Sequence, residues 1–215
     1  MSSVVAVLLA AGRSERMGAF KPLLPFGDTT VIRSCIQNLR DGGIDHVVVV
    51  LGHRAEEVKK NLADLNLRFA LNPDATSEMN ASIACGVRRL PNETRAVLVA
   101  LADQPAVPGE VIKAVVDEWE SGEKLVIPEF QGRGGHPVLV DLCFRDELLT
   151  LDPSRGLKAL FDAHRNQVRR VPLNSPFIAR DMDTWDDYRA LHVEIFGVSP
   201  ENQASGVFGN STDNS

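Results

Sequence analysis

Several classes of protein are disfavoured by what this sequence has little of. The chain has only three cysteines, Cys35, Cys85 and Cys143, and no C-x-x-C pair. Such widely spaced thiols predict neither a disulfide framework nor a thiolate metal site, and we interpret them as buried small apolar residues. No apolar run approaches the roughly 20 residues that span a bilayer. Residues 1–11 lack the charged region of a signal peptide, so we expect a cytoplasmic protein without a membrane partner.

Excess positive charge is also missing. The net charge of −6 argues against binding to nucleic acid or an anionic membrane, although a cationic pocket can lie within an acidic surface. Any polyanion that the protein binds should therefore be small. With 44% hydrophobic residues, the chain can form a substantial core. We expect a single domain over residues 1–196 and a disordered tail over residues 197–215, which are rich in Ser, Asn and Gly.

Two common nucleotide-binding motifs are absent after the apolar run at residues 4–9. No G-x-G-x-x-G follows it, which weakens a dinucleotide-binding oxidoreductase, and residues 12–21 do not match G-x-x-x-x-G-K-[ST], which excludes an ordinary Walker A loop. Small residues, two glycines and three cations follow instead. Glycines allow left-handed backbone and close approach of a ligand, and freed N–H groups can bind an anion. We predict a phosphate-binding loop, with an ordinary solvated turn as the alternative; its residues are Leu9, Ala10, Ala11, Gly12, Arg13, Arg16, Gly18 and Lys21.

Strands and helices alternate along nearly the whole chain. Continuous apolar runs at residues 4–9, 47–51 and 96–102 are typical of strands buried on both faces, which favours parallel pairing. Helical spacing of apolar residues separates these runs. This order predicts an α/β fold with a Rossmann-like, doubly wound, mainly parallel sheet and helices on both faces. Further strands are expected at 68–71 and 167–173, and helices at 31–39, 55–63, 77–87, from about 109, 142–149, 156–164 and 185–196.

Two strands, at residues 125–128 and 137–140, interrupt this rhythm and predict a small inserted β-hairpin. The connection between them contains three glycines, which allow close backbone approach. Loops on a rigid scaffold commonly bind ligands. We therefore place acceptor binding here, with a ligand-free glycine turn as the alternative; the residues are Arg133, Gly135, His136 and Pro137.

Three carboxylates are candidates for a metal site. Asp103 directly follows a buried strand, where open α/β sheets bind their ligands. Mg²⁺ takes oxygen donors and is usually held by one or two carboxylates together with substrate phosphates, although Asp103 could instead cap the next helix. Alternation along a strand would send Asp181 and Asp183 to one face, where either could complete the site. Ser82 lies near the start of a helix that could present N–H groups and hydroxyls to a nucleotide.

Residues 9–24 read L-A-A-G-R-S-E-R-M-G-A-F-K-P-L-L. Together with the segments at 77–86, 101–105, 134–139 and 181–184, this stretch resembles the motif set of the nucleotidyltransferases related to molybdenum cofactor biosynthesis. The resemblance covers about residues 4 to 192 and is greatest to the molybdenum cofactor cytidylyltransferase family, since Ala11 stands where the guanylyl branch typically has glycine. Two departures are an extra glycine before His136 and Trp185 where proline commonly follows D-x-D-T.

The resemblance implies a Mg²⁺-dependent transfer of CMP from CTP, with GTP as the alternative, to the phosphate of molybdenum-loaded molybdopterin. Pyrophosphate is the other product. It also implies that Arg16 and Lys21 neutralise the triphosphate and that Asp103, with Asp183 or Asp181, holds the metal. The remaining alternatives are transfer to another phosphorylated acceptor, such as a sugar or alcohol phosphate, and a non-catalytic accessory protein that binds the cofactor or a client molybdoenzyme.

Overall fold

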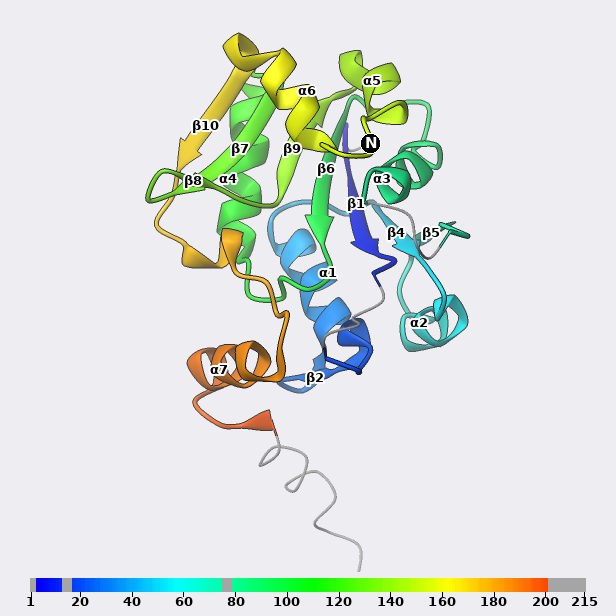
Figure 1. The fold of residues 1–215 in the computed structure, drawn as a ribbon, viewed down its shortest axis with the longest axis vertical. Helices are drawn as coiled ribbons and strands as arrows, with labels where there is room; N and C mark the ends of the chain where they lie inside the picture. Colours follow the sequence, from blue (N-terminus) through cyan, green and yellow to red (C-terminus); the bar gives the residue numbers. More distant parts are fainter. Residues whose placement is uncertain (1–2, 13–16, 75–78, 201–215) are drawn as a thin grey trace, which may run out of the picture.

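One central sheet organises the molecule. The computed structural model describes residues 3–12, 17–74 and 79–200. Within these ranges, eight strands form a sheet in the order β10-β7-β9-β6-β1-β4-β5, with β8 paired to β7 (Figure 1). The strands are β1 Val4–Ala10, β4 Val47–Leu51, β5 Arg68–Leu71, β6 Ala96–Leu101, β7 Leu125–Phe130, β8 Arg133–Gly134, β9 Val138–Asp141 and β10 Val168–Pro172, while β2 Pro25–Phe26 and β3 Thr29–Thr30 form a separate two-stranded ribbon.

Parallel pairing dominates the sheet. Strand β1 lies between β4 and β6 and is parallel to both, and β5 and β10 are parallel to β4 and β7. Every residue of β4 is buried, which is what a continuous apolar strand requires in a sheet covered on both faces. Only β8 and β9 run antiparallel to their neighbours. The predicted mainly parallel, doubly wound sheet is therefore confirmed.

Helices cover both faces of the sheet because side chains alternate along each strand. Val4, Ala6 and Leu8 of β1 join the core that contains residues of α1, α2 and α4, whereas Val5 and Val7 join the core under α3, α5 and α6. Helix α7 lies at one end of the molecule beside β2 (Figure 1). The helices are α1 Val31–Asp41, α2 Ala55–Asn61, α3 Met79–Val87, α4 Gly109–Glu120, α5 Arg145–Leu149, α6 Leu157–Ala163 and α7 Trp185–Phe196.

Three local expectations need correction. The two strands of the inserted hairpin are members of the main sheet, because β9 pairs with both β7 and β6. Residues 180–183 form no strand, so the alternation expected for Asp181 and Asp183 is wrong. Cys35 is buried, but Cys85 is only partly buried and Cys143 is exposed, since the 3₁₀ turn after β9 lies at the surface.

Some expectations concern residues outside the described ranges. They are the roles of Arg13 and Arg16, the helix start before Met79, and the tail from residue 201 onward. None of the helices in the ranges that the structure does describe has both the length and the apolar composition needed to cross a membrane.

Candidate functional site

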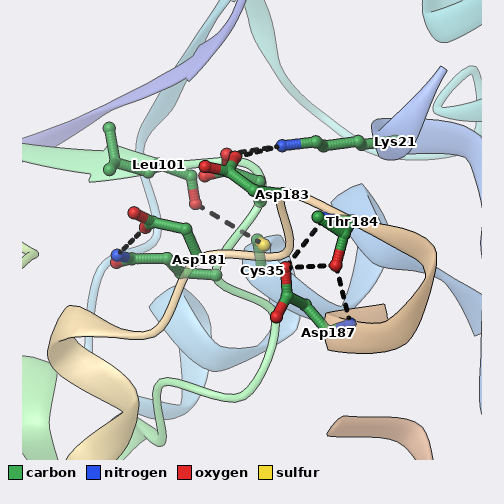
Figure 2. Close-up of polar contacts among 9 residues, drawn as sticks. Lys21, Cys35, Leu101, Asp181, Asp183, Thr184 and Asp187 are labelled. Atoms are coloured by element: carbon green, nitrogen blue, oxygen red, sulfur yellow. Dashed lines mark hydrogen bonds and ion pairs between the residues drawn. The ribbon is translucent and has the colours of Figure 1, made fainter. Parts of the chain in front are cut away.

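Lys21 lies at the centre of the candidate site. Its side chain is only 10% exposed, and its ammonium Nζ is 2.8 Å from Asp183 Oδ1 and 3.5 Å from Asp103 Oδ2. Figure 2 shows the Lys21 side chain reaching across to Asp183. A largely buried cation needs an anionic partner to offset its lost hydration. The structure therefore brings together three of the predicted site residues, from the 3₁₀ turn at Lys21–Leu23, the end of β6 and the segment before α7.

Helix α1 fixes the turn that carries Asp103. Ser34 Oγ and Asn38 Nδ2 donate hydrogen bonds to the Pro105 carbonyl at 3.1 and 2.7 Å, since residues four apart lie on the same face of a helix. Between them, Cys35 Sγ contacts the Leu101 carbonyl at 3.8 Å. Burial, and then the charge of Asp103, raises the pKa of the Cys35 thiol, which keeps it neutral. The carboxylate at position 103 is thus held by a rigid element.

The charge balance at this site favours a cation. Burial raises the pKa of Asp103; the Lys21 ammonium opposes that effect, and the nearby Asp181 carboxylate adds to it. Asp103 and Asp183 together carry one more negative charge than Lys21 can neutralise. Both present hard oxygen donors of the kind that Mg²⁺ prefers, so the donor set fits that ion. Among the described residues, no three His, Cys, Asp or Glu side chains gather in an arrangement that could hold a metal.

Asp181 has a different partner from Asp183. Its Oδ1 accepts a hydrogen bond from Gln104 Nε2 at 2.7 Å, and Figure 2 shows Asp181 and Asp183 directed to separate contacts. Gln104 is 6% exposed, so its amide is held in place beside Asp103. The sequence analysis did not single out Gln104; an amide directly after a strand-end acid was the signal available.

The predicted phosphate loop leaves the end of β1. Ala10 is buried, Ala11 is partly buried and Gly12 is exposed. Gly18 has a φ of +61°, the left-handed conformation that favours glycine, as the sequence predicted for this position. The loop approaches the turn after β4, because a Cβ added at Gly52 would lie 2.6 Å from the Ala11 carbonyl oxygen.

A hollow of about 400 Å³ lies next to this loop. Its lining includes His53, Arg54 and Asn72, from the ends of β4 and β5. Ser82, predicted to contact the nucleotide, is buried, and its hydroxyl accepts a hydrogen bond from Asn72 Nδ2 at 2.9 Å. The structure therefore places Ser82 behind Asn72, which sequence reasoning did not identify.

The predicted acceptor residues fall into two groups. A Cβ at Gly135 would lie 2.1 Å from the Ile178 carbonyl oxygen, so only glycine fits there, and His136 N donates to that same carbonyl at 2.7 Å. His136 precedes the buried Pro137 through a cis peptide bond. By contrast, Arg133 lies exposed on β8.

The His136 imidazole is partly buried against the sheet. Its Nδ1 is 3.4 Å from the Val99 carbonyl oxygen. Burial lowers the pKa of His136, although the Val99 carbonyl and the Asp181 charge oppose that effect. The ring is therefore neutral at pH 7 and lies within the electrostatic range of Asp181.

Comparison with known proteins gives a consistent result. Molybdenum cofactor cytidylyltransferase from Escherichia coli (strain K12) is 25% identical over 190 residues, 87% of this chain and 95% of that protein. Nicotine blue oxidoreductase from Paenarthrobacter nicotinovorans is 28% identical over 204 residues, 87% of this chain and 96% of that protein. The crystal structure of Rv0371C from Mycobacterium tuberculosis H37Rv in complex with manganese superposes with a TM-score of 0.75 at 28% identity, covering 88% of this chain and 98% of that one.

The family assignment rests on a longer stretch than any single motif. Residues 6–168 match the family described as the MobA-like NTP transferase domain. The matched range runs from β1 to the start of β10 and includes Lys21, Asp103 and His136. With its doubly wound sheet and the Lys21 site at the strand ends, the chain belongs to the MobA-like NTP transferase domain family, within the nucleotidyltransferase superfamily.

Proposed function

We propose that this chain transfers CMP from CTP to the phosphate of molybdenum-loaded molybdopterin, releasing pyrophosphate. The observation that carries the proposal is the buried Lys21 ammonium set against Asp103 and Asp183. It lies where doubly wound sheets bind their ligands. The 25% identity to molybdenum cofactor cytidylyltransferase, over most of both chains, supports this choice of substrates.

The transfer needs positioning and charge neutralisation rather than a protein nucleophile. An oxygen of the acceptor phosphate forms a bond to the α-phosphorus of CTP, and the bond from that phosphorus to the bridging oxygen breaks. Pyrophosphate leaves with the electron pair. The Lys21 ammonium neutralises oxygens of the triphosphate, and the loop from Leu9 to Gly12 contacts the base and the backbone of the nucleotide. Arg16 is proposed to assist Lys21.

Asp103 and Asp183 are the residues we propose to hold Mg²⁺. When bound, the ion supplies positive charge to the reacting phosphate oxygens. Asp183 is favoured over Asp181 as the second ligand because it shares Lys21 with Asp103, whereas Asp181 is held by Gln104. The manganese complex of the mycobacterial protein supports the use of a divalent cation.

The nucleotide and the acceptor are assigned to different sides of Lys21. The hollow of about 400 Å³ beside the phosphate loop has the size of an ordinary ligand pocket, and we assign it to the nucleotide. Gly135, His136, Pro137 and Arg133 are assigned to the acceptor. Because His136 and Asp181 interact electrostatically, Asp181 lies between the acceptor segment and Asp103.

The deciding experiment uses the purified full chain with Mg²⁺ or Mn²⁺, each of CTP, GTP, ATP and UTP, and molybdenum-loaded molybdopterin. Pyrophosphate release and mass spectrometry of the product should show a cytosine dinucleotide made from CTP. Lys113→Ala is a matched control, because Lys113 forms an exposed pair with Asp117 at 2.7 Å on α4. It should leave turnover within about twofold, since exposed ion pairs contribute little.

Other outcomes would redirect the proposal. Pyrophosphate release with sugar or alcohol phosphates, but not with molybdopterin, would identify a different acceptor. Tight binding of the cofactor without any product would support an accessory protein for a client molybdoenzyme. The identity to nicotine blue oxidoreductase makes a further arm necessary: reduction of a dye-like acceptor by a nicotinamide cofactor, without nucleotide transfer, would contradict the proposal.

A further inference from the structure

The start of α7 holds the Lys21 segment on both sides. Trp185 Nε1 donates a hydrogen bond to the Met17 carbonyl at 2.9 Å, and the Tyr188 hydroxyl donates to the Pro25 carbonyl at 2.5 Å. Met17 and Pro25 lie four positions before and four positions after Lys21. Two side chains from one helix therefore fix the backbone on either side of the central cation.

The helix end that provides these contacts is itself rigid. Thr184 and Asp187 form a capping box, in which Thr184 Oγ1 accepts from Asp187 N at 3.1 Å and Thr184 N donates to Asp187 Oδ2 at 2.8 Å. Trp185 and Tyr188 are three residues apart, so they lie on one face of the helix, and their rings meet edge to face at 5.9 Å. The adjoining Asp183 binds Lys21 itself.

Packing alone does not account for Trp185. Its side chain is exposed enough that the residue keeps 39% of its surface in solvent, so much of its apolar ring gains little from burial. Its indole N–H is nevertheless used to bind a backbone carbonyl in the proposed phosphate loop. Proline, which commonly follows D-x-D-T in the related proteins, has no side-chain donor to make this bond.

We propose that Trp185 is a positioning residue for nucleotide binding: through the Met17 carbonyl, and together with Tyr188, it fixes the loop so that Lys21 meets the phosphates. This inference rests on the nucleotide side of the proposed function and not on the identity of the acceptor.

Trp185→Phe tests the inference because it keeps an aromatic ring and removes the donor. We expect the Kd for CTP with Mg²⁺, measured by calorimetry, to rise roughly 3- to 10-fold, the size expected for one lost hydrogen bond. The KM for the acceptor should stay unchanged. Trp119→Phe is the matched control: its indole N–H donates to Asp141 Oδ2, also at 2.9 Å, at the other end of β6, and its loss should leave the Kd within twofold.

A second measurement uses fluorescence. The chain has two tryptophans, so Trp119→Phe leaves Trp185 as the only one. Its emission should change when CTP, or whichever of the four nucleotides binds, is added with Mg²⁺. A melting temperature that falls in Trp185→Phe while the Kd stays within twofold would show a purely structural role and overturn the inference.

The two proposals fail in different ways. If the wild-type chain binds a nucleotide but transfers nothing, the proposed function fails, and the Kd ratio between Trp185→Phe and wild type still decides the positioning role. If the wild-type chain binds none of the four nucleotides, the positioning role is overturned as well.

Discussion

Two acids at opposite ends of β6 show how the protein separates function from stability. Asp103 follows the carboxyl end of β6, and burial raises its pKa. Asp141 is in register with Ala96 at the other end; burial tends to raise its pKa too, but hydrogen bonds from Cys143 N and the Trp119 indole lower it overall. Strongly perturbed, incompletely satisfied groups are typical of functional sites. Asp141 therefore stabilises the fold, whereas ionised Asp103 has a cost in stability that function must justify.

Asp103→Asn should have the largest effect and would break the comparison if it did not. We expect turnover to fall by about 10³-fold or more, as when a group that stabilises charge in the transition state is removed. Because the folded-state pKa of Asp103 is raised, the carboxylate loses stability as the pH rises through that value. The melting temperature of Asp103→Asn at pH 7.5 should therefore equal or exceed that of wild type. Near-normal pyrophosphate release would refute the metal assignment.

Lys21→Met should lower both turnover and stability. We expect a loss of about 10²-fold in kcat/KM, because the cation that faces the triphosphate is removed. The variant also leaves Asp103 without its cation, which should cost about 1–2 kcal/mol, a value reduced by the partial exposure of both carboxylates. Thermal unfolding should show a drop of about 2–6 °C.

A double variant sharpens this result. Adding Asp103→Asn to Lys21→Met should restore most of the lost melting temperature without restoring turnover, since no buried charge is then left unpaired. Lys113→Met, at the exposed Lys113–Asp117 pair, is the control and should change neither quantity appreciably. A double variant less stable than Lys21→Met would count against the charge argument.

Asp141→Ala tests the other end of β6. It removes the acceptor of the Trp119 and Cys143 hydrogen bonds, which should cost about 1 kcal/mol. The folded-state pKa of Asp141 is lowered, so this stability is present above the unfolded pKa of about 3.9 and is lost as the pH falls through the folded value. Turnover should stay within about twofold. A larger loss of turnover at constant stability would erase the distinction between the two acids.

His136→Gln should give the smallest effect, visible only in the pH dependence. Because burial lowers the folded-state pKa of His136, its contribution to stability is present above the unfolded value of about 6.5 and is lost as the pH falls. The difference in melting temperature between pH 7.5 and pH 5.5 should be smaller in the variant than in wild type. An unchanged difference would show that the imidazole is as easily protonated in the folded chain as in the unfolded one.

The sequence by itself determined the elements whose pattern is local. The apolar run at Val47–Leu51 and the helix at Trp185–Phe196, capped by Thr184, were predicted with the bounds that the structure has. Both depend on interactions within a few residues, namely continuous burial and a cap. The family was also predictable, since its motifs lie in short segments, and the match over residues 6–168 confirms it.

Only the tertiary structure decided which side chains meet. Lys21 and Asp183 are 162 positions apart, and no local pattern shows which of Asp181 and Asp183 reaches the cation. The two acids have different partners because their segment is irregular and not a strand. Likewise, the hydrogen bond from Trp185 to Met17 depends on α7 lying beside the loop. Spacing along a chain determines faces of helices and strands, but pairing between distant segments is determined by how those elements pack.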